Sequence, residues 1–488
     1  MHVPINLTDE NLFKQQCYID GNWVYADDRT DFPVTNPADG TILGRVPNMG
    51  AREVSRAVLA AYTAWPGWRA RTAKERAVIL HRWYELIMAN REDLAVIVTS
   101  EMGKTLSESK IEVARAAACL EWFAEEGRRT YGDVIPAHRQ DNRIVVIKQP
   151  VGVCGAITPW NFPFNLPTRK AATALAAGCT IVLKPAGQTP YSSLALVELA
   201  ERAGLPKGVL NIVTGNSSVI GRELSENPLV RQVSFTGSTE VGKLLMRQCS
   251  GTLKKLSLEL GGHAPFIVFE DADLDAAVEG AVEAKFRSSG QSCVCTNRIL
   301  VQERFYDSFL AKFVAAVSGL EAGNGLDPTV KVGPLIDQAA VDRVEEQIRD
   351  AIGRGATLSL GGKRHRLGRT FFEPTILSEV TPDMLCAKEE TFGPLVPLIR
   401  FSSEEQAVSI ANDTNYGLAS YVYSRDLARV IRVTEALEYG MVGVNTGAIT
   451  TEVAPFGGVK ESGLGRECSK YGIEEYLETK YVCIGNLR

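Results

Sequence analysis

The segment RSSGQSCVCTN, residues 287–297, contains two cysteines, Cys293 and Cys295, behind a loop rich in glycine and serine. A thiol flanked by small residues is accessible, and its thiolate is a strong nucleophile when its pKa is lowered. A zinc site would need a second Cys or His pair at ligand spacing, which the sequence lacks, so no metal is expected. A disulfide between residues i and i+2 is strained and therefore reducible, so a redox-active pair stays open.

Two further residues have types suited to acyl chemistry. Glu259 lies in an apolar run just before two glycines, where burial would raise its pKa toward that of a general base. A glutamate in a structural ion pair is the commoner alternative. Asn161, between Trp160 and Phe162, could donate to a developing oxyanion or simply cap a turn. A cysteine hydrolase would need a histidine partner, and only His263 lies near these candidates.

Two strand-to-helix passages could bind a nucleotide. SFTGSTEVGK, residues 234–243, carries Gly237 and Ser238 in a turn before a helix, which suits a phosphate at a helix N-terminus. The full G-x-G-x-x-G pattern is absent, so an ordinary turn is an equal alternative. Lys184 in LKPAGQTP follows a strand and could hold ribose hydroxyls or a phosphate, although a solvated lysine is the simpler interpretation.

These residues lie in an alternating pattern of predicted strands and helices. From about residue 151, strand-like VGVCGAITP, CTIVLKPA, GVLNIVTG and VRQVSFTG alternate with helix-like segments, which predicts a parallel, doubly wound α/β sheet. A second mixed region covers about residues 262–460. The tail ends in the strand-like KYVCIG, which has no evident partner in its own segment.

Composition narrows the class of protein. A chain of 488 residues predicts two or more domains, and a net charge of -5 argues against a nucleic-acid surface. The N-terminus has no signal-peptide pattern, and the longest weakly polar run, residues 171–183, is too short to span a bilayer. The ten cysteines are then most simply reduced thiols, and a cytoplasmic protein without a membrane partner is expected.

Taken in order, PWNFP, FTGSTEVG, LELGG, GQSCVC, EETFGP and PFGGVKESGLGRE resemble the NAD(P)-dependent aldehyde dehydrogenase superfamily over essentially the whole chain. The resemblance implies a Rossmann-type cofactor domain (1–130 and 151–261), an α/β catalytic domain (262–460) and a small β oligomerisation arm (131–150 and 461–488). It also implies a homodimer or homotetramer, with KYVCIG pairing across subunits.

The resemblance assigns roles residue by residue. Cys293 matches the nucleophile that attacks the aldehyde, Glu259 the general base that activates water, and Asn161 the oxyanion donor. Cys295 is then a packing residue or a thiol that closes a reversible disulfide with Cys293. The residues expected to contact the cofactor are Trp160, Lys184, Gly237, Ser238, Glu390 and Phe392.

More detailed likeness points to the succinate-semialdehyde dehydrogenase group. Arg169, Arg287 and Thr450 match positions that hold the substrate's far carboxylate, for which a guanidinium is well suited. Phe164, Asn165 and His263 depart from that group, so glutarate semialdehyde or a non-acidic aldehyde stays open.

Alternatives also stay open for the choice of cofactor and for the class of protein. Gly187 stands where NAD-preferring relatives place a glutamate, so either cofactor is tolerated, with NADP slightly favoured over NAD. The alternative classes are a silent binding protein on this scaffold and a cofactor-free cysteine esterase.

Overall fold

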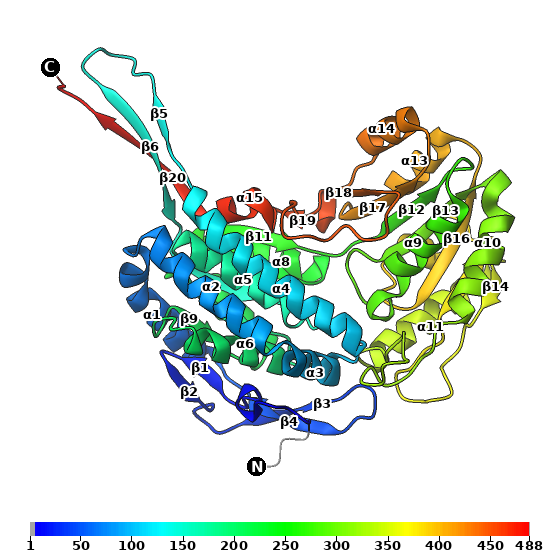
Figure 1. Ribbon diagram of the computed structural model, residues 1–488, viewed down its shortest axis with the longest axis horizontal. Helices are drawn as coiled ribbons and strands as arrows, with labels where there is room; N and C mark the ends of the chain where they lie inside the picture. The colour runs from blue at the N-terminus through cyan, green and yellow to red at the C-terminus, as the bar shows by residue number, and fades with distance from the viewer. Residues whose placement is uncertain (1–4, 488) are drawn as a thin grey trace.

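The computed structural model describes residues 5–487 of the chain. Two large sheets, each covered by helices, form two lobes, and a narrow three-stranded sheet projects from the first (Figure 1). The doubly wound α/β organisation expected after residue 151 is present. Residues 1–4, with which the expected cofactor domain begins, lie outside the described residues.

The first large sheet has the strand order β19-β11-β10-β7-β8-β9-β1-β2, and the strands from β11 to β9 run parallel. Its strands are β1 (Cys17–Ile19), β2 (Asn22–Val24), β7 (Val153–Ile157), β8 (Thr180–Lys184), β9 (Leu210–Ile212), β10 (Val230–Thr236), β11 (Lys255–Glu259) and β19 (Gly463–Leu464).

Strand β7 is the point at which the chain order of this sheet reverses, because β8 pairs with one of its edges and β10 with the other. In open α/β sheets, ligands bind beyond the carboxyl ends of the strands at such a point. The segment with Trp160 and Asn161 follows β7, and Gly237 and Ser238 follow β10. The topology therefore brings two distant candidate segments to one edge of the sheet.

Helices cover both faces of this sheet (Figure 1). They are α1 (Ala51–Arg69), α2 (Ala73–Ala89), α3 (Arg91–Met102), α4 (Leu106–Glu126), α5 (Asn165–Ala177), α6 (Tyr191–Arg202), α7 (Ser217–Glu226) and α8 (Thr239–Cys249). Helix α5 is buried along its whole length, since its alanines let it pack between β8 and the helices α2 and α4. The apolar run 171–183 is thus an interior helix and strand. Among residues 5–487, no helix is long and apolar enough to cross a membrane.

The second large sheet has the order β14-β15-β16-β13-β12-β17-β18 and is parallel except for β14. Its strands are β12 (Ala264–Val268), β13 (Thr296–Gln302), β14 (Thr357–Leu360), β15 (Thr375–Ser378), β16 (Leu395–Phe401), β17 (Ala419–Tyr423) and β18 (Met441–Val444). The helices of this lobe are α9 (Leu274–Phe286), α10 (Glu303–Ser318), α11 (Gln338–Gly353), α12 (Leu385–Lys388), α13 (Glu404–Asn412) and α14 (Leu427–Ala436).

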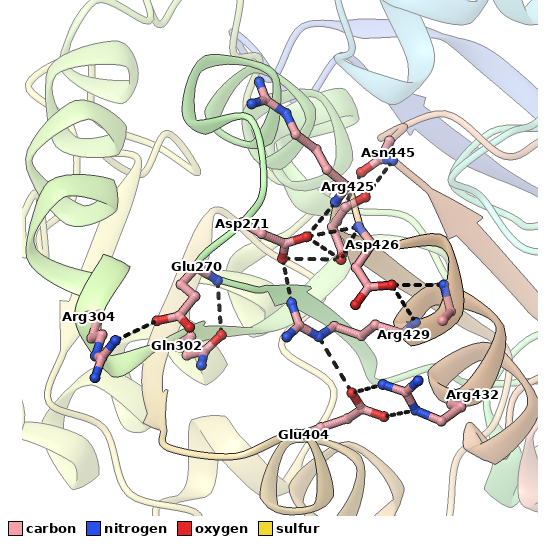
Figure 2. A network of polar contacts seen from close by, with 12 residues as sticks. Glu270, Asp271, Gln302, Arg304, Glu404, Arg425, Asp426, Arg429, Arg432 and Asn445 are labelled. Carbon is pink, nitrogen blue, oxygen red and sulfur yellow. Dashed lines mark hydrogen bonds and ion pairs between the residues drawn. The ribbon is translucent and has the colours of Figure 1, made fainter.

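A polar network fixes α13 and α14 to the end of β12 (Figure 2). Asp271, just beyond β12, accepts hydrogen bonds from the backbone N–H groups of Arg425 and Asp426 and pairs with Arg429 at 2.6 Å. Glu404 of α13 pairs with Arg429 and Arg432 of α14. These contacts hold α13 and α14 near the end of β12, and none of the residues involved lines the candidate site.

The projecting sheet contains β5 (Asp133–Ile135), β6 (Arg143–Pro150) and β20 (Leu477–Ile484), in the order β20-β6-β5. Strand β20, which contains most of KYVCIG, pairs antiparallel with β6 of the same chain over its whole length. The sequence suggested pairing across subunits for this strand, whereas one of its edges already has an intrachain partner. A separate hairpin joins β3 (Asp31–Thr35) and β4 (Ile42–Pro47).

The start of the tail differs from the expected arm boundary at residue 461. Strand β19 completes the edge of the first large sheet by pairing with β11, because the backbone groups at the end of β11 need a partner. The short helices α15 (Ser469–Gly472) and η6 (Ile473–Tyr476) follow, and η6 packs against α5. Only β20 enters the projecting sheet, so residues 461–476 belong with the first lobe.

Candidate active site

A cavity of about 420 Å³ is lined by segments of both lobes. Cavities of this size suit small-molecule ligands. All of the residues that the sequence nominated line it except Glu259, Lys184 and Cys295. The nominated lining residues are Trp160, Asn161, Arg169, Gly237, Ser238, Arg287, Cys293, Glu390, Phe392 and Thr450.

Cys293 sits between a strained turn and strand β13. Ser288, Ser289 and Gly290 all have positive φ angles, 51°, 58° and 76°, which turn the chain sharply after α9. The main chain of Cys293 also lies against Gly262, where an added Cβ would be 2.3 Å from the Cys293 carbonyl oxygen. The second glycine of LELGG is therefore needed for a close backbone approach.

The environment of the Cys293 thiol favours its protonated form. Burial raises the pKa of this thiol to about 12, and the negative charges of Glu390 and Glu259 act in the same direction, whereas Arg169 opposes them. The side chain is nevertheless partly exposed to the cavity. A base or a change on ligand binding must therefore remove the proton before attack.

Asn161 is held next to the cysteine loop. Its Nδ2 donates to the carbonyl oxygen of Gln291 at 3.2 Å, and its Oδ1 is buried without a partner within residues 5–487. One N–H of the amide is thus occupied, which fixes the amide plane, and the second N–H is free to donate to an anion in the cavity.

Glu259 is the last residue of β11 and is buried just outside the cavity lining. Neither carboxylate oxygen has a hydrogen-bond partner among the described residues. Burial raises its pKa well above the usual range, as does the charge of Glu467, while Lys170 and Arg169 oppose the shift. The Oε1 atom lies against Gly457, where an added Cβ would be 2.8 Å away. The carboxyl group is therefore unpaired among the described residues, unlike a glutamate in a structural ion pair, and its raised pKa suits a general base.

Arg169 has an acidic partner that the sequence did not reveal. Its guanidinium lies 3.3 Å from Glu467, which also pairs with Lys170 at 2.6 Å, and it stacks at 4.7 Å on Phe456. Arg169 therefore keeps an acidic partner even without a carboxylate substrate. Its Nε is still buried without a hydrogen-bond partner in the described part of the chain.

Arg287, at the end of α9, lines the cavity with Thr450 and forms no ion pair within 4.0 Å among residues 5–487. Two further arginines, Arg115 of α4 and Arg343 of α11, line the same cavity. Sequence reasoning missed Arg115, although its place four residues after Ile111 puts both on one helix face.

The groups nominated for the cofactor cluster at the carboxyl edge of the first sheet. Lys184 is buried and donates to Ser217 Oγ at 2.6 Å, and burial lowers its pKa to about 8. Glu390 accepts from the Gly262 N–H at 3.0 Å, and burial raises its pKa to about 7. The rings of Trp160 and Phe392 meet edge to face with centroids 5.5 Å apart.

These residues fit a dinucleotide. Ser238 caps α8, whose free N–H groups suit a phosphate. The buried hydroxyl of Thr236, which lines the cavity, has no hydrogen-bond partner among the residues that the structure describes. A second cavity, lined by Gly187 and Phe32, shares Ile336 with the first. Gly187 has no side chain that could repel a phosphate.

Cys295 and His263 are buried away from the main cavity lining. The Cys295 thiol donates to the Lys285 carbonyl oxygen at 3.2 Å. Burial, and then the charge of Arg298, keep the pKa of His263 well below its usual value, so the ring is neutral. A histidine with no access to the cavity does not serve as the partner of a cysteine hydrolase. No cluster of three potential metal ligands occurs in the part of the chain that is described.

A doubly wound sheet, a cavity at its switch point and a thiol near a buried carboxyl group define an α/β enzyme suited to covalent chemistry on a carbonyl group. The model of the aldehyde dehydrogenase family matches residues 23–482, and the chain belongs to that family. It is 61% identical over 483 residues to a glutarate-semialdehyde dehydrogenase of Pseudomonas aeruginosa, covering 99% of this chain and 100% of the relative.

Two other proteins extend the likeness. The NADP-dependent succinate-semialdehyde dehydrogenase of Escherichia coli is 60% identical, over 99% of this chain and 100% of the relative. The crystal structure of a succinate-semialdehyde dehydrogenase from Burkholderia pseudomallei superimposes with a TM-score of 0.98 at 60% identity, covering 98% of this chain and 99% of that one. The aldehyde dehydrogenase-like fold expected from the sequence is confirmed.

Proposed function

We propose that this enzyme oxidises an aldehyde with a distal carboxylate, succinate semialdehyde first and glutarate semialdehyde as the alternative. The observation that carries the proposal is one cavity that holds the Cys293 thiol together with Arg287, Arg169 and Thr450. Guanidinium and hydroxyl donors suit a carboxylate at the far end of a short substrate. The names of the similar enzymes support the same class of substrate.

In the proposed mechanism, the Cys293 thiolate attacks the aldehyde carbon and forms a thiohemiacetal. The free N–H of Asn161 donates to the oxyanion, and its bond to Gln291 keeps the amide in place. After oxidation to the thioester, Glu259 takes a proton from a water molecule, which attacks the acyl carbon and releases the acid and the thiol. The unpaired Glu259 oxygens are available for that proton.

NADP, slightly favoured over NAD, would supply the hydride acceptor when bound. Lys184, Gly237 and Ser238 would hold its ribose and phosphate groups, and Trp160, Glu390 and Phe392 its nicotinamide end. The absence of a side chain at Gly187 supports tolerance of both cofactors. The two lobes then correspond to the proposed cofactor domain and catalytic domain.

We also propose a homodimer or homotetramer in the cytoplasm. The projecting sheet supports this assembly, because it carries exposed apolar side chains that a monomer would leave in water. These are Tyr131, Val134, Ile135, Ile147, Tyr481 and Ile484.

A reversible Cys293–Cys295 disulfide remains a hypothesis for oxidative inactivation. Both thiols would lose a proton and an electron to a peroxide, which is reduced to water. Cys295→Ala should then remove the part of peroxide inactivation that dithiothreitol reverses. If the variant and the wild type respond alike and neither recovers with dithiothreitol, Cys295 is a packing residue.

The test of the main proposal is a set of initial rates for succinate semialdehyde, glutarate semialdehyde, butanal and benzaldehyde, each with NAD and NADP. The acidic aldehydes should exceed the neutral ones in kcat/KM by about 10² or more. Equal rates for butanal would overturn the distal carboxylate while leaving the family intact. Ester turnover with no reduced cofactor formed from any aldehyde would indicate the cofactor-free esterase instead.

A further inference from the structure

We propose that Arg115 is a further specificity-determining residue, which binds the distal anion of the substrate together with Arg287. This inference rests on the proposed oxidation of an acidic aldehyde and names a group that neither the sequence motifs nor the expected arginine pair includes. The two arginines come from α4 of the first lobe and the end of α9 of the second.

Helix α4 presents one face to the cavity. Glu108, Ile111, Glu112 and Arg115 all line it, at the i, i+3, i+4 and i+7 spacing of a single helical face. The N-terminal end of α4 points toward the second lobe (Figure 1). Arg115 is only partly exposed, so its guanidinium belongs to the cavity wall more than to open solvent.

The two acids on that face are committed to other partners. Glu112 pairs with Lys104 at 2.6 Å and accepts the backbone N–H groups of Phe164 and Asn165, which start α5. Glu108 accepts from Thr105 and from the backbone N–H of Ser288 at 2.6 Å. Neither carboxylate is therefore free to neutralise Arg115.

Arg115 itself forms no ion pair within 4.0 Å and no hydrogen bond through its side chain in the described chain. Burial lowers its pKa, and the like charges of Arg287 and Arg169 act in the same direction, while Glu283 and Glu452 act against it. An unpaired, partly buried guanidinium beside a second cation is costly unless an anion binds there.

The contrast with Arg169 strengthens the assignment. Arg169 shares Glu467 with Lys170, so part of its charge is neutralised within the protein. Arg115 and Arg287 lack such a partner among residues 5–487. Arg343 of α11 also lines the cavity without an ion pair in the described chain, but its side chain is exposed to solvent. A carboxylate that enters the cavity would therefore meet its less exposed unpaired cations at Arg115 and Arg287.

The experiment compares Arg115→Met, Arg115→Lys and the wild type with succinate semialdehyde and with butanal. Arg82→Met, at an exposed position of α2, is the matched control for loss of an arginine. Arg115→Met should raise KM and lower kcat/KM for the semialdehyde by roughly tenfold to a hundredfold, the value of a charge-assisted hydrogen bond. The rate with butanal should stay within about twofold, and Lys should restore part of the loss.

The outcomes separate this inference from the proposed function. If the wild type prefers the semialdehyde and Arg115→Met keeps that preference, Arg115 is no specificity residue although the function stands. Equal losses with semialdehyde and butanal would indicate a structural role and also overturn the inference. If the wild type shows no preference for the acidic aldehyde, the proposed function itself fails.

Discussion

At the scale of single residues, burial shifts the pKa values of the acidic groups in the site in one direction. Burial raises the pKa values of Cys293, Glu259 and Glu390, and each anion would raise the pKa of Cys293 further. Perturbed pKa values of this kind cluster at functional sites.

The first prediction concerns the pH dependence of the thiol. Below a pKa of about 12, the thiolate fraction of Cys293 rises about tenfold per pH unit, so inactivation of the free enzyme by iodoacetamide should accelerate through about pH 6 to 9 without a plateau. Peptide mapping distinguishes Cys293 from the exposed Cys483. A plateau at neutral pH would show that the thiol is already ionised.

The second prediction concerns the amide of Asn161. Asn161→Ala should lower kcat by roughly 10²–10³, because the oxyanion loses a donor. Thermal unfolding of the variant serves as the control, since the lost bond to Gln291 is a single hydrogen bond. A loss of less than about fivefold would argue that another group holds the oxyanion.

The third prediction separates the two half-reactions. Glu259→Gln should still release about one equivalent of reduced cofactor per site in a burst, and its steady-state rate should fall by roughly 10²–10⁴ because hydrolysis lacks its base. The burst is measured by stopped-flow absorbance. If the burst disappears as well, Glu259 is needed for attack by the thiol rather than for hydrolysis alone.

At the scale of elements, the N-terminus of α4 contacts the turn of residues 288–290 that precedes Cys293. Thr105 and Glu108 form a capping box, and Glu108 also accepts the N–H of Ser288, the first residue of the turn with positive φ. A cap of the first lobe thus supports a strained turn of the second.

The fourth prediction uses a matched pair of variants at this junction. Thr105→Ala should cost about 1 kcal/mol of the free energy of unfolding and leave iodoacetamide inactivation unchanged, because the hydrogen bond that the Ser288 N–H donates to Glu108 remains. Glu108→Ala should in addition slow catalysis by up to about 10², since the turn before Cys293 loses its tether. Equal behaviour of the two variants would show that only the helix cap matters.

At the scale of the whole molecule, the projecting sheet is the part whose surface is least suited to a monomer in water. Its apolar side chains are exposed, and β20 and β5 are its edge strands. Edge strands and apolar surface together favour pairing with another copy.

The fifth prediction follows from that surface. Removal of residues 477–488 should shift the enzyme to a smaller assembly in light scattering, because β6 loses its partner and the apolar surface is reduced. The matched control is Tyr471→Ser, which removes an exposed aromatic residue outside the arm. An unchanged molar mass after truncation would place the interface elsewhere.

The sequence by itself determined the alternating strands and helices after residue 151, because apolar periodicity and glycine turns are local properties. It also nominated Cys293, Glu259 and Asn161, whose types and motif order suffice to name a chemistry. The tertiary structure decided which charges meet: the pairing of Glu467 with Arg169 and Lys170, the unpaired Arg115, and the place of β19 beside β11. These contacts join residues far apart in the chain, and no local pattern encodes a partner that only folding brings near.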